Sequence, residues 1–349
     1  MKLNRLKYLF VYTVPVSAVL SFTGEGLWAF APLIYAFGIV PVFEFLLPVN
    51  GRNLTEAERN WVENSRFFDV LLFVMLPVQW CLLVLFFVSI QGLDPWTALW
   101  WGRVSGMGVM SVVVGINVAH ELGHRPGRLH QLASQGLLLS TLYLQFFIEH
   151  NRGHHRDVGT HGDPGTARKW EVLFLFWLRA LPTVWRGAWQ LEAARLKRAK
   201  QPIWSRHNQM IRFQLTQVAL VLVVWQLFGV DVLIGFGLAS LFGILQLETV
   251  NYIEHYGLTR KKVSEFRYEA VRPEHSWNSN HTVGRLLLFE ISRHSDHHHL
   301  PGKPYPTLDH VEDAPQMPTG YPGMILMALV PPLWFWVMHR QIRRLPSRI

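Results

Sequence analysis

Residues 97–124 read TALWWGRVSGMGVMSVVVGINVAHELGH. The stretch 97–119 is predominantly apolar and long enough to cross the hydrocarbon core of a bilayer, which takes about 20 helical residues. The residues that follow place His120 and His124 four positions apart, so on a helix both imidazoles lie on one face, one turn apart. We therefore predict a membrane-spanning helix that ends in two side chains able to share one metal ion.

The composition of the whole chain also indicates a membrane protein. Of its 349 residues, 50% are hydrophobic and only 16% are charged, a balance that soluble globular domains rarely reach. Cys81 is the only cysteine among them, so neither a disulfide framework nor a cysteine-ligated metal site is available. Any metal ion must be held by carboxylates and by the 17 histidines. No internal repeat or low-complexity linker divides residues 1–349, which we treat as one domain.

Six stretches have the length and apolarity of a transmembrane helix. They are residues 8–22, 27–49, 67–90, 97–119, 213–228 and 230–252. The predicted fold is an all-α membrane protein with six transmembrane helices and a cytoplasmic, histidine-rich cap made of residues 120–212 and 253–349. Two further apolar stretches, 132–148 and 324–338, are long enough to raise the question of whether they also cross the membrane.

The distribution of basic residues predicts the orientation, because short cytoplasmic loops are rich in Lys and Arg. Three short turns between spans contain neither and carry acidic residues instead, Glu25, Asp94 and Asp231, so we place these turns outside the cytoplasm. The loop at 51–66, the basic segment 125–212 and both chain termini then lie in the cytoplasm, together with the histidines of the cap.

This orientation decides the two doubtful stretches. If residues 132–148 crossed the membrane, His150 would lie on the opposite face from His120, about 30 Å away, and no metal site could include both. We therefore expect 132–148 to form an in-plane or re-entrant helix. We expect 324–338, which Pro331-Pro332 interrupts, to stay on the cytoplasmic side.

Further histidines recur in short clusters. HNRGHH at 150–155 repeats the i, i+4 pair and adds His155, which points about 100° away from His154 on a helix; HSDHH at 294–298 adds three more, and NYIEHYGL at 251–258 adds one. One zinc ion needs three or four ligands, so a set this large predicts two ions, and neutral imidazoles suit iron, copper or zinc. The predicted ligands are His120, His124, His150, His154, His155, His255, His294, His297 and His298.

Neighbouring polar side chains are candidates for orienting these ligands through the second ring nitrogen of each imidazole. The candidates are Glu121, Asp157, Glu254, His275, His281 and Asp296. The aromatic side chains of the spans are candidates for lining a channel that admits an apolar substrate, although aromatic residues in such spans are more often in contact with lipid.

The histidine boxes at 120–124, 150–155 and 294–298 resemble the three boxes of the membrane fatty acid desaturase and hydroxylase superfamily. Three further matches narrow the resemblance to its bacterial alkane 1-monooxygenase branch: NYIEHYGL, HSWNSNH at 275–281 and PTGYPGM at 318–324. The resemblance implies a non-haem enzyme of the bacterial inner membrane with two irons.

The same resemblance implies a reaction and a partner. The enzyme would hydroxylate the terminal methyl of medium-chain n-alkanes with O₂, giving 1-alkanols, and would take electrons that pass from NADH through a rubredoxin reductase to a rubredoxin. A rubredoxin iron needs four thiolates, so the rubredoxin is expected to be a separate protein. The basic cytoplasmic surface is a candidate docking face for it, and equally a contact for anionic lipid.

Three other functions stay open on the sequence alone. A related hydroxylase or desaturase would act on fatty acyl, aromatic methyl or terpenoid substrates with the same metal pair. An intramembrane zinc protease would use His120 and His124 with Glu121 as general base, and a metal-storing or transporting protein would catalyse nothing. The net charge of +9 does not indicate nucleic-acid binding, because no nucleic-acid-binding motif accompanies it.

Overall fold

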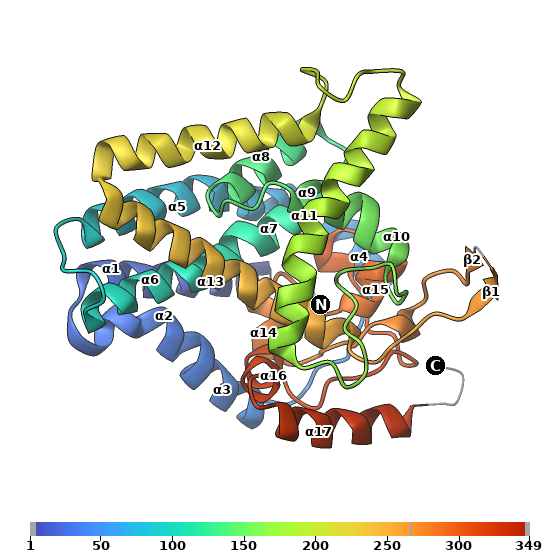
Figure 1. Cartoon of the computed structure of the whole chain (residues 1–349). Coiled ribbons are helices and arrows are strands. Elements are labelled where there is room, and N and C mark those ends of the chain that lie inside the picture. The colour runs from blue at the N-terminus through green and yellow to red at the C-terminus, as the bar shows by residue number, and fades with distance from the viewer. Residues whose placement is uncertain (1–4, 266, 346–349) are drawn as a thin grey trace.

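The computed structural model describes residues 5–265 and 267–345, most of them in helices (Figure 1). Among these residues, six helical segments are long and apolar enough to cross a membrane: Arg5–Thr23, Gly26–Leu46, Phe67–Ile90, Ala98–Gly123, Gln209–Phe228 and Val230–His255. Each overlaps a predicted span, so the prediction of a helical fold with six transmembrane helices is confirmed. The ends differ by a few residues because apolarity marks the hydrocarbon core, whereas a helix can continue beyond it.

Three of the spans are single helices, namely α5 (Phe67–Ile90), α12 (Gln209–Phe228) and α13 (Val230–His255). The others change helix type along their length. The first span joins η1 (Arg5–Tyr12) to α1 (Thr13–Thr23). The second consists of η2 (Gly26–Phe30), α2 (Ala31–Ile34), η3 (Tyr35–Ile39) and α3 (Val40–Leu46). The fourth consists of α6 (Ala98–Met110), η4 (Ser111–Ile116) and α7 (Asn117–Gly123).

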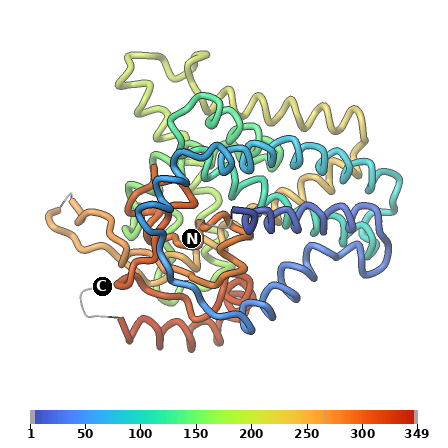
Figure 2. The backbone as a smooth tube through the Cα atoms, turned by 180° about the vertical axis from the view of Figure 1, so that it is seen from behind, coloured from blue at the N-terminus to red at the C-terminus, as the bar shows by residue number. Residues whose placement is uncertain are grey.

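The remaining elements form a cap at one end of the spans (Figure 2). From its first half come α4 (Glu56–Glu63), α9 (Phe146–Glu149), η5 (His150–His154), α10 (His155–Asp157) and α11 (Leu173–Arg198); α8 (Arg128–Leu139) lies beside the spans instead (Figure 1). From its second half come η6 (Pro273–His275), α14 (Thr282–Leu287), α15 (His294–His299), η7 (Tyr305–Thr307), α16 (Tyr321–Ala328) and α17 (Pro331–Arg344). A short antiparallel hairpin of β1 (Lys262–Ser264) and β2 (Arg267–Tyr268) also lies here.

The stretch 132–148 folds as a re-entrant hairpin. Helix α8 packs beside α7, where Ser134 Oγ donates a hydrogen bond to the carbonyl of Ala119. Further along, Trp80 Nε1, midway along α5, donates to the carbonyl of Gly136 at 3.1 Å. The chain then turns, and α9 returns to the cap end. This geometry confirms the expectation that His150 lies on the same side as His120.

The stretch 324–338 likewise forms no span. It is divided between α16 and α17, and Pro331-Pro332 occupy the first two positions of α17, where proline costs no hydrogen bond. Tyr321, at the start of α16, donates its hydroxyl hydrogen bond to Glu254 near the end of α13. The first residues of η1 and the last residues of α17 both lie at the cap end (Figures 1 and 2).

Helix α11 crosses the ends of the spans at a steep angle (Figure 1). It exposes Phe174, Leu175 and Leu178, while its last turn carries three basic residues. Trp177 ties it to the bundle by donating from Nε1 to Thr249 Oγ1 at 3.1 Å. Exposed apolar side chains together with basic ones are typical of helices that lie on a membrane surface.

Small residues allow α6 and α13 to pack closely, as in many membrane helix pairs. A Cβ atom on Gly243 would lie 2.7 Å from Ser111 Cβ and 3.1 Å from the carbonyl oxygen of Gly108. Gly108 in turn leaves room for the ring of Phe242. The fourth and sixth spans, which carry His120 and His255, are thereby held at a fixed distance.

We expect Gly243→Ala to destabilise the protein by about 1–3 kcal/mol, the usual effect of overfilling a packed core, because the backbone of α6 cannot move aside. Gly237→Ala is the matched control in the same helix, since a Cβ there meets nothing within 4 Å. Thermal unfolding in detergent or nanodiscs measures both. Equal melting temperatures for the two variants would contradict the close packing.

Candidate metal centre

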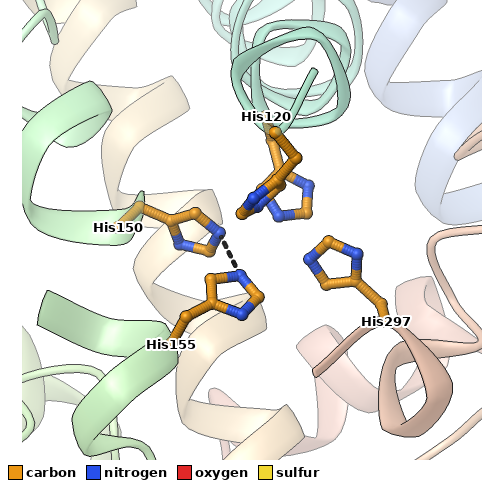
Figure 3. A group of neighbouring side chains, drawn as sticks. His120, His150, His155 and His297 are labelled. Atoms are coloured by element: carbon orange, nitrogen blue, oxygen red, sulfur yellow. Dashed lines mark hydrogen bonds between the residues drawn. The ribbon is translucent and has the colours of Figure 1, made fainter. Parts of the chain in front are cut away.

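The nine predicted ligands gather into two adjoining groups at the cap end of the spans. One group holds His120, His124, His150, His155 and His297, and the other holds His154, His255, His294 and His298. Within each group the candidate ligand atoms all lie within 4.8 Å of one another. Figure 3 shows four rings of the first group converging from three separate segments of the chain. Every member of both groups is a residue that the sequence predicts as a ligand.

Two pairs of neighbouring histidines divide between the groups. The rings of His154 and His155 lie 5.9 Å apart at an angle of 75°, and each belongs to a different group. The rings of His297 and His298, 5.7 Å apart at 80°, divide in the same way. Consecutive residues on a helix point about 100° apart, so a helix placed between two ions can serve both.

A π-helical turn changes which histidines of the second box act together. The i, i+4 spacing predicts that His150 and His154 share a group, but the structure pairs His150 with His155, and their Nε2 atoms lie 2.9 Å apart. Residues five apart on a regular α-helix point about 140° apart. The wider π-turn of η5, which begins at His150, brings such residues onto one face, so His150 and His155 belong to the same group.

Most of the rings outside the spans are held in their neutral form, with His154 as the exception. Burial lowers the pKa of His124 to about 3, and neighbouring positive charge adds to this effect. Burial, reinforced by neighbouring rings, also lowers the pKa of the remaining rings in this set well below its usual range: His150, His155, His294, His297 and His298. Neutral imidazoles are the form that binds metal ions.

Many ring nitrogens have no hydrogen-bond partner among the described residues. They include Nε2 of His120, His124 and His154, and both ring nitrogens of His297 and His298. Buried polar atoms without partners are rare in native proteins, and lone pairs that face one another are costly unless a cation lies between them. The donor set therefore fits two metal ions, each surrounded by imidazole nitrogens.

Asp163 orients one ligand of the second group. Both of its carboxylate oxygens lie 3.0 Å from Nδ1 of His154, and Thr166 Oγ1 and the backbone N–H of Gly165 donate hydrogen bonds to it. Burial favours a neutral His154 ring, but the carboxylate outweighs it and raises the pKa of His154 to about 9. A carboxylate on the far nitrogen is the usual partner of a metal-binding histidine, and it leaves Nε2 free.

Asp163 is not among the residues predicted from the sequence. The residue lies eight positions after His155, in the segment HGDPG, and only the turn that follows α10 brings it back under His154. The available signal in the sequence was an acidic residue close to a histidine box. Asp157 is nearer to the box and was predicted as the orienting residue instead.

Glu254 is the predicted orienting residue that reaches a histidine group. Its Oε2 lies 3.1 Å from Nε2 of His294, and its Oε1 accepts the hydroxyl hydrogen bond of Tyr321 at 2.5 Å. Ser276, which follows the predicted His275, lies with its Oγ 3.4 Å from Nδ1 of His255. The loop 275–281 thus approaches the centre through a serine rather than through its histidines.

Three other acidic candidates are engaged elsewhere within the described part of the chain. Glu121 accepts hydrogen bonds from Arg125 and from the backbone N–H of Tyr305, because it points about 100° away from His120 on α7. Asp296 binds Lys303, since it lies on α15 between the ligand positions 294 and 297. Asp157 pairs with its neighbour Arg156 at the surface.

The two histidine candidates also face away from the centre. Nε2 of His275 lies 3.4 Å from Glu269, next to the hairpin, and its Nδ1 accepts a hydrogen bond from the backbone N–H of Arg272. His281 contacts the hydroxyl of Ser279. The predictions that Glu121, Asp157, Asp296, His275 and His281 orient the ligands are therefore not supported by these contacts.

An apolar channel leads from the centre into the bundle. Beside the histidines it is lined by His120, His150 and His294, with Glu254 and Tyr321 among the polar groups. Further in, the lining is almost entirely apolar and comes from α1, η3, η4, α13 and α16. The two parts share Val112, Val250, Leu288 and Tyr321 in their walls, so they adjoin one another. Two π-helical turns, η3 and η4, line it, as such turns often do at functional sites.

Comparisons with known proteins agree with this architecture. A model of the family described as fatty acid desaturase matches residues 94–328. Alkane 1-monooxygenase 1 of Alcanivorax borkumensis is 36% identical over 350 aligned residues, which cover 95% of this chain and 83% of the relative. Alkane 1-monooxygenase of Pseudomonas putida is 37% identical, with 90% of this chain and 77% of the relative covered. The chain belongs to the alkane 1-monooxygenase family.

This alkane 1-monooxygenase family member is therefore a multi-pass membrane protein and an oxidoreductase of the monooxygenase type. A more distant relative is the hydroxylase component XylM of the xylene/toluene monooxygenase of Pseudomonas putida, 29% identical over 67% of this chain and 62% of the relative. The geometry of Glu121 also argues against the zinc protease, because a protease base must reach a metal-bound water, whereas this carboxylate is held by Arg125.

We expect Asp163→Asn to weaken metal binding at the second histidine group by about 10- to 100-fold, the usual effect of losing such a partner. Asp157→Asn is the matched control, because its carboxylate contacts Arg156 at the surface. Competition with a chromophoric chelator measures the affinity. Unchanged affinity in the Asp163 variant would contradict its orienting role.

Proposed function

We propose that this chain is a di-iron alkane 1-monooxygenase that converts medium-chain n-alkanes and O₂ into 1-alkanols and water. The observation that carries the proposal is the position of two groups of imidazoles beside the end of an apolar channel. Names of relatives at 36% and 37% identity support the substrate class. For each alkane, one O₂, two electrons and two protons give one alkanol and one water.

In this proposal each histidine group holds one iron. His120, His124, His150, His155 and His297 would bind the first, and His154, His255, His294 and His298 the second. Imidazole nitrogen is a suitable ligand for iron as well as for zinc and copper, and the family relationship favours iron. When bound, the iron pair would supply the activation of O₂. The chain itself positions the substrate, excludes water and orients the ligands.

The channel explains oxidation at the terminal carbon. A flexible alkane has no polar group for a side chain to hold, so its position is determined by the shape of the walls alone. His120, His150 and His294 line the polar end of the path, and a chain that enters from the apolar part presents its end to them first. The apolar lining also keeps water from the reacting carbon.

The proposed location is the bacterial inner membrane, with the metal centre in the cytoplasm. Lys and Arg are concentrated at the cap end, while the three short turns at the other end carry Glu25, Asp94 and Asp231; this pattern supports a cytoplasmic cap. Both termini would share that side; the outermost residues, 1–4 and 346–349, are outside the described residues.

Electrons would come from a separate rubredoxin, supplied by NADH through a rubredoxin reductase. Basic side chains close to the centre support docking of an acidic protein. Arg156 follows the ligand His155 directly and is exposed, and the hairpin after α13 exposes Lys261, Lys262 and Arg267. Long-range attraction of this kind speeds association and weakens as salt increases.

The second candidate function is a methyl hydroxylase for aromatic substrates, which the similarity to XylM favours. It would use the same metal pair and the same channel. Comparing octane with toluene or xylene under identical conditions distinguishes the two functions, because only one of these substrates would then be turned over efficiently.

The proposal predicts about two irons per chain and formation of 1-octanol when the reduced protein meets octane and O₂ with a reduced rubredoxin. Anaerobic metal analysis followed by single-turnover gas chromatography measures both. His298→Ala is expected to lose metal from the second group, whereas His299→Ala, exposed and outside both groups, should retain it. One zinc without iron, or two irons without any alkanol, would contradict the proposal.

The depth of the channel is expected to limit the length of the alkanes that the enzyme accepts. Val109 lines the inner part and lies 11 residues before His120 on the same span, about 16 Å along the helix. Val109→Phe should lower turnover of the longest accepted alkanes by about fivefold or more, the effect of overfilling by one ring, and spare shorter ones. Val88→Phe, on the exposed face of α5, is the control. Equal losses for all chain lengths would contradict the assignment.

A further inference from the structure

One face of α13 connects the metal centre to the membrane. Glu254 and Val250 line the channel beside the histidines, Gln246 lines its inner part, and Phe242 lies beyond it. These residues are spaced four apart, so they lie on one face of the helix. Together they cover about 18 Å along its axis.

Beyond the channel lies a second apolar hollow, which we call the lateral groove. Its lining includes Leu33, Phe37, Trp177, Phe242, Gln246 and Ile325. Phe37, Gln246 and Ile325 also line the channel, so these three side chains form the boundary between the two spaces. Leu326 and Leu329, on the far side of the groove, are exposed apolar residues, which indicates that the groove opens towards lipid.

The boundary lies inside the membrane. Gln246 is nine residues before the end of α13 at His255, which is about 14 Å along the helix. The sixth predicted span ends at residue 252, so we place Gln246 within the hydrocarbon core, while Ile325, Leu326 and Leu329 reach the groove from the cap.

Gln246 is the polar member of this boundary. Its side chain belongs to a residue only 7% exposed, and its Nε2 has no hydrogen-bond partner among the described residues. A buried polar atom without a partner calls for an explanation, and unlike Gln79, Gln246 lines a hollow. Gln246 belongs to the wall that the two spaces share, and rotation about its side-chain bonds would turn this unpaired donor towards a molecule in either of them.

We propose that Phe37, Gln246 and Ile325 form a binding station for the hydroxyl group of a primary alcohol that moves between the channel and the lipid. The side-chain N–H of Gln246 donates to the alcohol oxygen, and the two apolar side chains contact the alkyl chain. This inference rests on the proposed function, which makes a long-chain alcohol inside an apolar channel. An alkane gains no hydrogen bond there, so the station favours departure of product without slowing entry of substrate.

A second outer hollow is a weaker candidate for the same role. It touches the channel only through Tyr35 within the described lining residues. The hydroxyl of Tyr35 is already paired with Thr13 Oγ1 at 2.6 Å, so this boundary offers no free donor to an alcohol.

The test measures binding without turnover. The protein is placed in nanodiscs, as isolated and without reductant, and is photolabelled with 1-octanol that carries a diazirine near its hydroxyl end. Unlabelled 1-octanol or octane then competes. We expect label on the peptides that contain residues 37 and 325, and we expect Gln246→Leu to raise the half-competing concentration of 1-octanol about three- to tenfold, the effect of one lost neutral hydrogen bond. Competition by octane should not change.

Controls separate this effect from loss of structure. Gln79→Leu removes another buried amide without a partner. Gln79 lies next to Gly115 and outside the lining of both spaces, so this variant should change neither the competition by 1-octanol nor that by octane. If Gln246→Leu folds poorly, Gln246→Met, whose side chain has a similar length, should raise the half-competing concentration of 1-octanol by the same factor. Unchanged 1-octanol competition, or labelling centred on residues 28 and 35, would overturn the proposal. Binding at the station without any conversion of octane would contradict the proposed function alone.

Discussion

The lone pairs of nine largely buried imidazoles are the constraint on which the rest of this structure depends. Neutral rings that face one another without donors are stable only around positive charge, so the chain must bring all nine to one place and keep them there. Since the rings come from two transmembrane helices, a re-entrant hairpin and a cap helix, each of these elements has to end on the same side of the membrane. The re-entrant path of α8 and α9 follows from this requirement.

The helical turns that depart from regular α-helix geometry lie along the channel and at the metal centre. The π-turns η3 and η4 line the channel, and η5 places His150 with His155 rather than with His154. A π-turn adds one residue to a helix, which rotates everything that follows and locally widens the helix. Glycines on α6 and α13 have the opposite effect, because they let two spans approach closely while the channel stays open beside them.

The two histidine groups differ in their surroundings. Carboxylates contact the second group, Asp163 through His154 and Glu254 through His294, whereas the described contacts of the first group are with other rings and with Phe146. A carboxylate on the far ring nitrogen, as Asp163 on His154, makes the ring a stronger donor, whereas Glu254 lies against the nitrogen of His294 that also faces His255. The two bound ions would therefore experience different fields, even though both are surrounded by imidazole.

The sequence by itself determined the number of spans and the nine histidines that meet at one end of them. These features follow from apolar length, local spacing and loop charge, all of which are properties of short segments. Only the tertiary structure decided how the histidines divide, because a single π-turn reverses the pairing that an i, i+4 spacing predicts. It also decided the partners of the ligands: Asp163 reaches His154 through a turn, while Asp157 and Asp296, closer in sequence, point elsewhere. Proximity along the chain does not determine the direction of a side chain, and direction is what a metal centre requires.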